Sequence, residues 1–137
     1  MNILFDINIL LDAFLERHIF VEHSAYLIDL AEKRIISGWL GATTITTIYY
    51  LLAKELGKKE ADVITQSLFN IFDITSVNRT VLETALGIDF PDYEDAVLHQ
   101  SAFHSNLDGI LTRNGQDYRN SKLPVYTPQE LIAALEA

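Results

Sequence analysis

The chain has 137 residues, of which 49% are hydrophobic, and a formal net charge of −9 at pH 7. This length suits one domain with a sizeable core, and the hydrophobic content excludes an intrinsically disordered chain. Because the sequence contains no cysteine, it excludes disulfides, thiol catalysis, zinc–thiolate sites and iron–sulfur clusters. We therefore expect a single domain over residues 1–137.

The acidic balance argues against nonspecific binding of nucleic acid by a basic surface. Two interpretations remain: the protein does not bind nucleic acid, or it binds locally, where metal ions and a few cations override the global charge. A partner that supplies a basic segment also fits this charge. No run approaches the roughly 18 apolar residues of a membrane-spanning helix, and the first residues lack the basic start of a signal peptide. We expect a soluble, cytoplasmic protein.

Short apolar runs alternate with amphipathic stretches along the chain. The run 2–5 has the pattern of a buried parallel strand, Gly57 marks a helix end, and Pro128 suits the first turn of a last helix. The expected strands are 2–5, 39–42, 72–74, 109–112 and 124–126, and the expected helices are 8–15, 20–34, 43–56, 59–69, 79–86, 92–104 and 128–135. Because parallel strands need crossover helices, this alternation predicts an α/β fold whose parallel sheet is covered on both faces.

Acidic side chains lie at the same end of several of these elements. Asp6 ends the first apolar run, Asp95 lies in the first turn of a helix, and Asp117 follows the run 109–112. In an α/β sheet these positions converge at the carboxyl ends of the strands. Carboxylates gathered there repel one another unless a divalent cation lies among them. The pattern therefore suggests Mg²⁺ or Mn²⁺ and phosphate-ester chemistry, with these three aspartates as catalytic and metal-binding residues.

Helix capping is the alternative interpretation of the acids. Asp6 or Asn8 can cap the helix after the first strand, and acids at positions 92, 94 and 95 suit the positive end of a helix dipole. For Asp6 we favour the metal, because an ionised carboxylate in a buried run needs a partner. The acids around Asp95 exceed what a cap requires, which favours Asp95 as a ligand and makes Glu94 a second candidate.

Polar residues after the run 109–112 have two interpretations as well. For any one of Thr112, Arg113, Asn114 and Asp117, a polar turn is the better interpretation. In the functional interpretation, Asn114 and Asp117 complete the cation site and Arg113 meets a phosphate.

Two further residues lie near the predicted site in sequence. Thr47 belongs to a threonine-rich helix start, where capping and packing are the main roles and a hydroxyl near a metal is the minor one. His99 follows Asp95 by one helical turn, so a hydrogen bond near the site is one interpretation, but we favour a surface position.

Four segments in this order resemble the PIN domain family, in particular small bacterial proteins of the VapC toxin kind. They are Asp6-Ile7-Asn8-Ile9-Leu10, the helix from Thr44 through Ile48-Tyr49-Tyr50-Leu51-Leu52, Asp92-Tyr93-Glu94-Asp95-Ala96, and Ile110-Leu111-Thr112-Arg113-Asn114 with Asp117-Tyr118. The resemblance implies a three-layer Rossmann-like fold with a central parallel sheet of four to five strands. It also implies a divalent-metal-dependent endoribonuclease that cleaves single-stranded or tRNA-like RNA, an antitoxin partner and a homodimer.

The resemblance assigns the family's first and third acids to Asp6 and Asp95, and the last acidic position to Asp117 or Asn114. The chain departs from the pattern at Ile7, where the family has Thr or Ser, and at Asn114, where it has Asp. It also departs at Thr47, where the family's second acid falls.

Rival hypotheses follow from these departures and from the site chemistry. A catalytically weak or inactive PIN-like protein that binds RNA or a protein partner is the main rival, because the second acid is missing. A small-molecule phosphohydrolase is the other rival, which Asn8 disfavours because such a loop needs a second aspartate there. A dimer or antitoxin groove is expected from the apolar residues Phe14, Leu15, Ile19 and Phe20 and from the helix that carries Tyr49 and Tyr50.

Overall fold

A computed structural model describes residues 1–17 and 19–137 and contains one five-stranded sheet. The strands are β1 (Asn2–Phe5), β2 (Ser37–Gly41), β3 (Asp73–Thr75), β4 (Gly109–Leu111) and β5 (Val125–Tyr126). Their spatial order is β3-β2-β1-β4-β5, and every neighbouring pair is parallel. The predicted parallel sheet is therefore confirmed, and its carboxyl edge is formed by the ends of all five strands.

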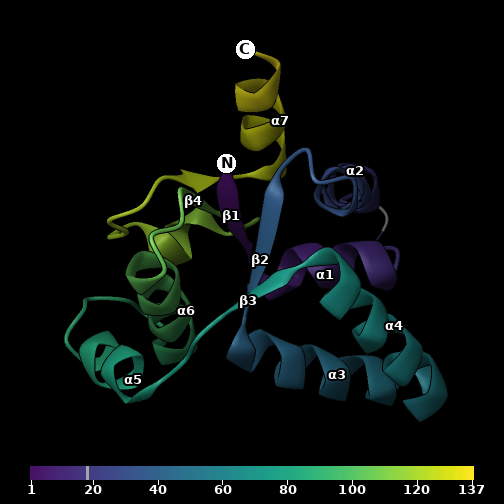
Figure 1. Ribbon diagram of the computed structural model, residues 1–137, viewed down its shortest axis with the longest axis horizontal. Helices are drawn as coiled ribbons and strands as arrows, with labels where there is room; N and C mark the ends of the chain where they lie inside the picture. Colours follow the sequence, from purple (N-terminus) through teal and green to yellow (C-terminus); the bar gives the residue numbers. More distant parts are fainter. Residues whose placement is uncertain (18) are drawn as a thin grey trace.

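Helices cover both faces of this sheet and make a three-layer molecule (Figure 1). They are α1 (Ile7–Phe14), α2 (Val21–Glu32), α3 (Ala42–Leu56), α4 (Lys58–Ile71), α5 (Arg79–Leu86), α6 (Tyr93–His104) and α7 (Pro128–Glu136). In Figure 1 the green α5 and α6 lie on one side of the sheet, and α1, α2, α3 and α4 lie on the other. The α7 helix packs against α2 and β5.

The central strand β1 is buried on both faces, as a strand in a covered parallel sheet must be. Ile3 and Phe5 belong to the larger core cluster, which includes residues of α1, α2, α3 and α4. Leu4, between them, belongs to a second cluster that includes Leu98 of α6 and the side chain of Tyr118. The alternation of neighbouring side chains between two cores holds the end of β1, and therefore residue 6, in a fixed position.

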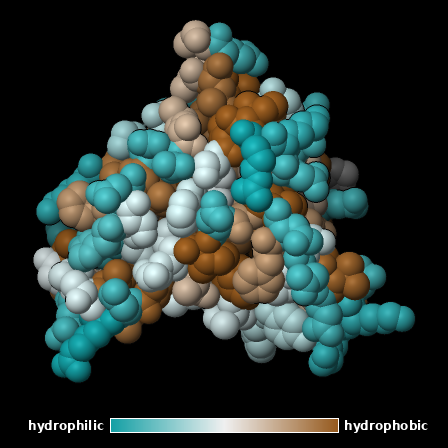
Figure 2. Space-filling view, viewed as in Figure 1, coloured by the Kyte–Doolittle hydropathy of each residue, from teal (hydrophilic) through white to brown (hydrophobic). Residues whose placement is uncertain are grey.

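Element boundaries differ from the predicted ones by a few residues, as expected where helix ends fray. The element that the sequence analysis did not predict is a short 3₁₀ helix, η1 (Gly115–Tyr118), between β4 and β5. Within the described part of the chain, no helix has the length and apolar character needed to span a bilayer. Figure 2 shows hydrophobic residues over α7 and at the middle of the viewed face, set among hydrophilic ones.

Gly38 of β2 tests how tightly the larger core is packed. A Cβ at this position would lie 2.7 Å from the Phe72 ring and 3.0 Å from Ala31, and the Phe72 ring is held edge-on by Phe5 at 5.0 Å. We expect Gly38→Ala to lower the free energy of unfolding by about 1–3 kcal/mol because the ring has no room to move. Urea denaturation measures this loss, with Gly87→Ala, whose nearest contact is an ordinary 3.5 Å, as the control. Equal stability of the two variants would contradict the prediction.

Candidate functional site

Asp6 lies at the carboxyl end of β1 with 5% of its surface exposed. Its backbone N–H continues the sheet by donating to Leu111 at 2.9 Å. One carboxylate oxygen, Oδ1, accepts from the Ile7 N–H at 2.7 Å and caps α1. The other, Oδ2, accepts from the Thr112 hydroxyl at 2.8 Å and from the Asn8 amide at 3.2 Å. The capping interpretation therefore describes one oxygen, and the second oxygen is held by side chains of the candidate site.

Thr112 and Asn8 tie the loop after β4 to Asp6. The Thr112 hydroxyl also accepts from the Asn114 N–H at 3.1 Å, and the Asn8 amide oxygen accepts from the Arg113 N–H at 3.3 Å. The exposed Asn114 is placed in this loop by its backbone. Residues 6, 8 and 112–114 thus form one hydrogen-bonded unit across β1 and β4, which are neighbours in the sheet.

Asp95 approaches the same place from the first turn of α6. Asp92 caps this helix by accepting from the Glu94 N–H at 2.7 Å. The buried phenol of Tyr118, at the end of η1, donates to Asp95 Oδ1 at 3.3 Å. Burial, followed by the negative charges of Asp6, Asp92 and Asp117, raises the pKa of Asp95 to about 7.

The same mutual repulsion acts on the other members of the site. Burial raises the pKa of Asp6, and the charges of Asp117 and Glu94 raise it further. Burial raises the pKa of the Tyr118 phenol well above its ordinary value, and Asp6, Asp95 and Asp117 add to the rise. Since all three aspartates act on Tyr118, the structure brings Asp6, Asp95 and Asp117 into one electrostatic site.

Oxygen donors that repel one another fit a divalent cation, which neutralises such a set. The residues that can hold the ion are Asp6, Asp95 and Asp117, with Asn8 and Thr112 fixing the direction of Asp6. Among residues 1–17 and 19–137, no three acidic or histidine side chains are already close enough to ligate one ion together. To share one ion, these carboxylates would have to lie closer together than they do in this structure.

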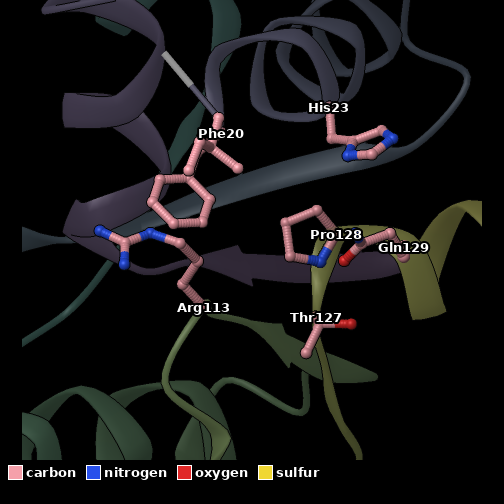
Figure 3. Close-up of a pocket in the computed structure, with 7 residues that line it drawn as sticks. Phe20, His23, Arg113, Thr127, Pro128 and Gln129 are labelled. Atoms are coloured by element: carbon pink, nitrogen blue, oxygen red, sulfur yellow. The ribbon is translucent and has the colours of Figure 1, made fainter. Parts of the chain in front are cut away.

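Arg113 is held by a buried acid that the sequence analysis did not single out. Asp12 of α1 is fully buried and accepts from Arg113 Nε at 2.7 Å and from its NH2 group at 3.3 Å. Arg17 lies 3.5 Å from the same carboxylate, and the Arg113 guanidinium lies 4.1 Å from the centre of the Phe20 ring (Figure 3). The sequence signal for Asp12 was an acid on the apolar face of α1, next to Leu10 and Leu11.

Thr47 and Glu94 line one shallow groove together with residues of α5 and α6. Thr47 does not hydrogen-bond to the aspartates within the described contacts, whereas the charge of exposed Glu94 reaches Asp6. The expectation of a surface position for His99 is wrong. His99 is buried because Phe90 and Phe103 pack against its ring. Its Nε2 accepts a hydrogen bond from the Lys122 N–H at 3.0 Å.

Comparison with known proteins gives one consistent group of relatives. A model of the PIN domain family matches residues 2–116. The ribonuclease VapC1 of Aquifex aeolicus (strain VF5) is 26% identical over 130 residues, which are 91% of this chain and 89% of that protein.

The solved structures that resemble this fold include VapBC from Salmonella typhimurium bound to DNA, with a TM-score of 0.70, 12% identity and coverage of 93% of this chain and 98% of that one. They also include VapBC2 from Rickettsia felis bound to a promoter DNA fragment, with a TM-score of 0.69, 14% identity and coverage of 93% and 98%. These likenesses confirm the three-layer fold.

Asp95 gives the metal-free protein a defined pH dependence. Its pKa is about 7 in the folded state, whereas a free aspartate side chain has a pKa of 3.8. Because of this raised pKa, Asp95 adds to the free energy of unfolding below pH 4, and its contribution is lost as the pH rises through 7. Because Asp95 is partly exposed, we expect a loss of about 1 kcal/mol after allowing for solvent screening.

The measurement is urea unfolding of chelator-treated protein at pH 5 and pH 8, comparing the native chain with Asp95→Asn. Asn keeps an acceptor for Tyr118 but carries no charge, so the variant should gain stability relative to the native chain at pH 8. An identical pH dependence of the two proteins would contradict the assigned repulsion.

Asp12 should be more important for stability than an exposed acid. We expect Asp12→Asn to lower the free energy of unfolding by about 2 kcal/mol, because it leaves two guanidinium groups without their anion. Asp29→Asn, which breaks an exposed pair with Lys33 at 2.8 Å, is the matched control and should cost about 0.5 kcal/mol or less. Thermal or urea unfolding of both variants makes the comparison, and equal losses would overturn it.

Proposed function

This chain belongs to the PIN domain family, and we propose on that basis that it is a divalent-metal-dependent endoribonuclease. The observation that carries the proposal is electrostatic: burial, together with the charges of Asp6, Asp92 and Asp117, raises the pKa of Asp95 to about 7. A site with this property gains free energy by binding a cation. The matched relative from Aquifex aeolicus carries the name ribonuclease, which supports RNA as the substrate.

In this proposal Asp6, Asp95 and Asp117 hold Mg²⁺ or Mn²⁺, and Glu94 adds negative charge at the rim. The bound ion supplies a more acidic water and neutralises charge on the phosphoryl oxygens. Asn8 and Thr112 hold Asp6 Oδ2 in one direction, as residues behind a metal ligand do. Arg113 and Asn114 lie in the loop that joins this unit to η1, where they meet the RNA backbone.

An antitoxin partner is part of the same proposal. Solved relatives of the fold are toxin–antitoxin complexes, including one from Klebsiella pneumoniae with a TM-score of 0.66 and 19% identity. Of the residues expected in the partner groove, Ile19, Phe20 and Tyr50 are exposed, whereas Phe14 and Leu15 pack against the core. The exposed residues can bury apolar surface against an antitoxin or a second copy of the chain. Light scattering of the isolated protein distinguishes a homodimer from a monomer.

An inactive PIN-like binding protein is the second candidate function. It is favoured by Thr47, a residue without a carboxylate in the groove that Glu94 also lines, and by the lack, among residues 1–17 and 19–137, of three acids close enough to share one ion. Calorimetric titration with Mn²⁺ separates the two candidates. Absence of heat at millimolar metal, together with a stable partner complex, favours the binding protein.

Cleavage of unstructured RNA in Mn²⁺ or Mg²⁺ tests the enzyme directly. We expect metal-dependent cleavage by the native chain and at least a hundredfold loss in Asp6→Asn, since the central carboxylate is removed. The variant should also lose the metal-induced rise in melting temperature, which is independent of turnover. Asp73→Asn, which changes an exposed acid on edge strand β3, is the control. Equal cleavage by native protein and Asp6→Asn would indicate a contaminating nuclease and remove the proposal.

A further inference from the structure

A second cavity lies beside the candidate metal site, between the start of α2 and the start of α7. Its volume is about 260 Å³, and its walls are formed by Ile19, Phe20, His23, Arg113, Thr127, Pro128 and Gln129. Figure 3 shows Phe20, His23 and Pro128 around the hollow, with Arg113 along one side and Gln129 at the opposite end. The volume lies just below the range of about 300–1,000 Å³ typical of pockets for drug-sized ligands, so it fits a single planar ring system.

We propose that this cavity binds one unpaired nucleotide of the RNA strand whose neighbouring phosphate lies in the aspartate site. The proposal rests on the ribonuclease function proposed above and adds a binding position to it. RNA-binding sites for single strands combine a ring on which a base stacks with polar groups that reach its edge. Phe20 provides the ring and Gln129 the amide in this cavity.

Charge favours an RNA occupant here over the groove near Thr47. No carboxylate is among the described residues that line this cavity, and Arg113 is its formally charged member. The groove near Thr47 is lined by Glu94, which repels a phosphate. Beside the cavity, the single charge of Asp12 is shared by Arg113 and Arg17, which leaves one net positive charge in a chain of net charge −9.

Hydrogen bonds also connect one wall of the cavity to the candidate metal site. The N–H of Arg113 donates to the Asn8 amide oxygen, and the Asn8 amide nitrogen donates to Asp6. One wall of the cavity is therefore two hydrogen bonds from the central carboxylate. The guanidinium covers part of Phe20 at 4.1 Å, and 37% of the residue remains exposed.

Fluorescence anisotropy with a labelled single-stranded RNA decamer tests the assignment in an Asp6→Asn background, where turnover is suppressed. We expect Phe20→Leu to raise Kd about fivefold to tenfold, as the loss of one stacked base does, and Gln129→Ala to raise it by a smaller factor. The controls are Phe69→Leu and Gln66→Ala, the same substitutions at exposed positions of α4, which should leave Kd unchanged. With Asp6 restored, the cavity variants should raise KM for RNA more than they lower kcat.

The outcomes separate this inference from the proposed function. If the native chain cleaves RNA and both cavity variants bind and cleave like their controls, the nucleotide position is wrong and the cavity belongs to a protein segment instead. If the native chain binds RNA through the cavity but cleaves nothing in Mg²⁺ or Mn²⁺, the nucleotide position stands and the enzyme proposal fails. If the native chain neither binds nor cleaves RNA, both are overturned.

Discussion

Electrostatic repulsion among the carboxylates at the carboxyl edge of β1 and β4 is the constraint on which this structure depends. Asp6 is held by the Ile7 N–H and the Thr112 hydroxyl, so it has no freedom to turn away from the other acids. Asp95 is held by the Tyr118 phenol and feels the charges of Asp6 and Asp117. A fold selected for stability alone would separate such groups, because buried like charges oppose folding. The divalent cation of the proposed function would relieve this repulsion.

The rest of the fold supplies the rigidity that keeps these acids together. The two faces of β1 contribute to different cores, which prevents the strand from sliding in register. The buried pair between Asp12 and Arg113 joins α1 to the loop after β4. Since Thr112 in the same loop contacts Asp6, the ion pair and the hydroxyl act on adjacent residues of one segment. The same segment continues into η1, which positions Asp117 and Tyr118.

Regular features of the fold followed from sequence, because strand burial and helix caps are local patterns. The run at β1 and the helix that Asp92 caps were predicted on this basis, and so was the position of Asp6 at a strand end. Asp12 and Tyr118 were not predicted, since their importance comes from partners 101 and 23 residues away. His99 was misplaced for a similar reason: its neighbour Phe90 and the Lys122 N–H come from separate segments. Contacts between distant segments have no periodic signal in one sequence.

The acidic net charge and an RNA substrate are compatible when charge is considered locally. Electrostatic attraction falls off over about 8–10 Å at physiological salt, so a strand in the site feels nearby groups more than the −9 total. A bound divalent ion cancels much of the charge of the aspartates, and the Asp12 cluster with two arginines has a net positive charge. Acidic surfaces elsewhere then discourage nonspecific contacts with duplex or folded nucleic acid. In the proposed enzyme, binding would then be limited to a strand flexible enough to place a phosphate at the carboxylates and a base beside Phe20.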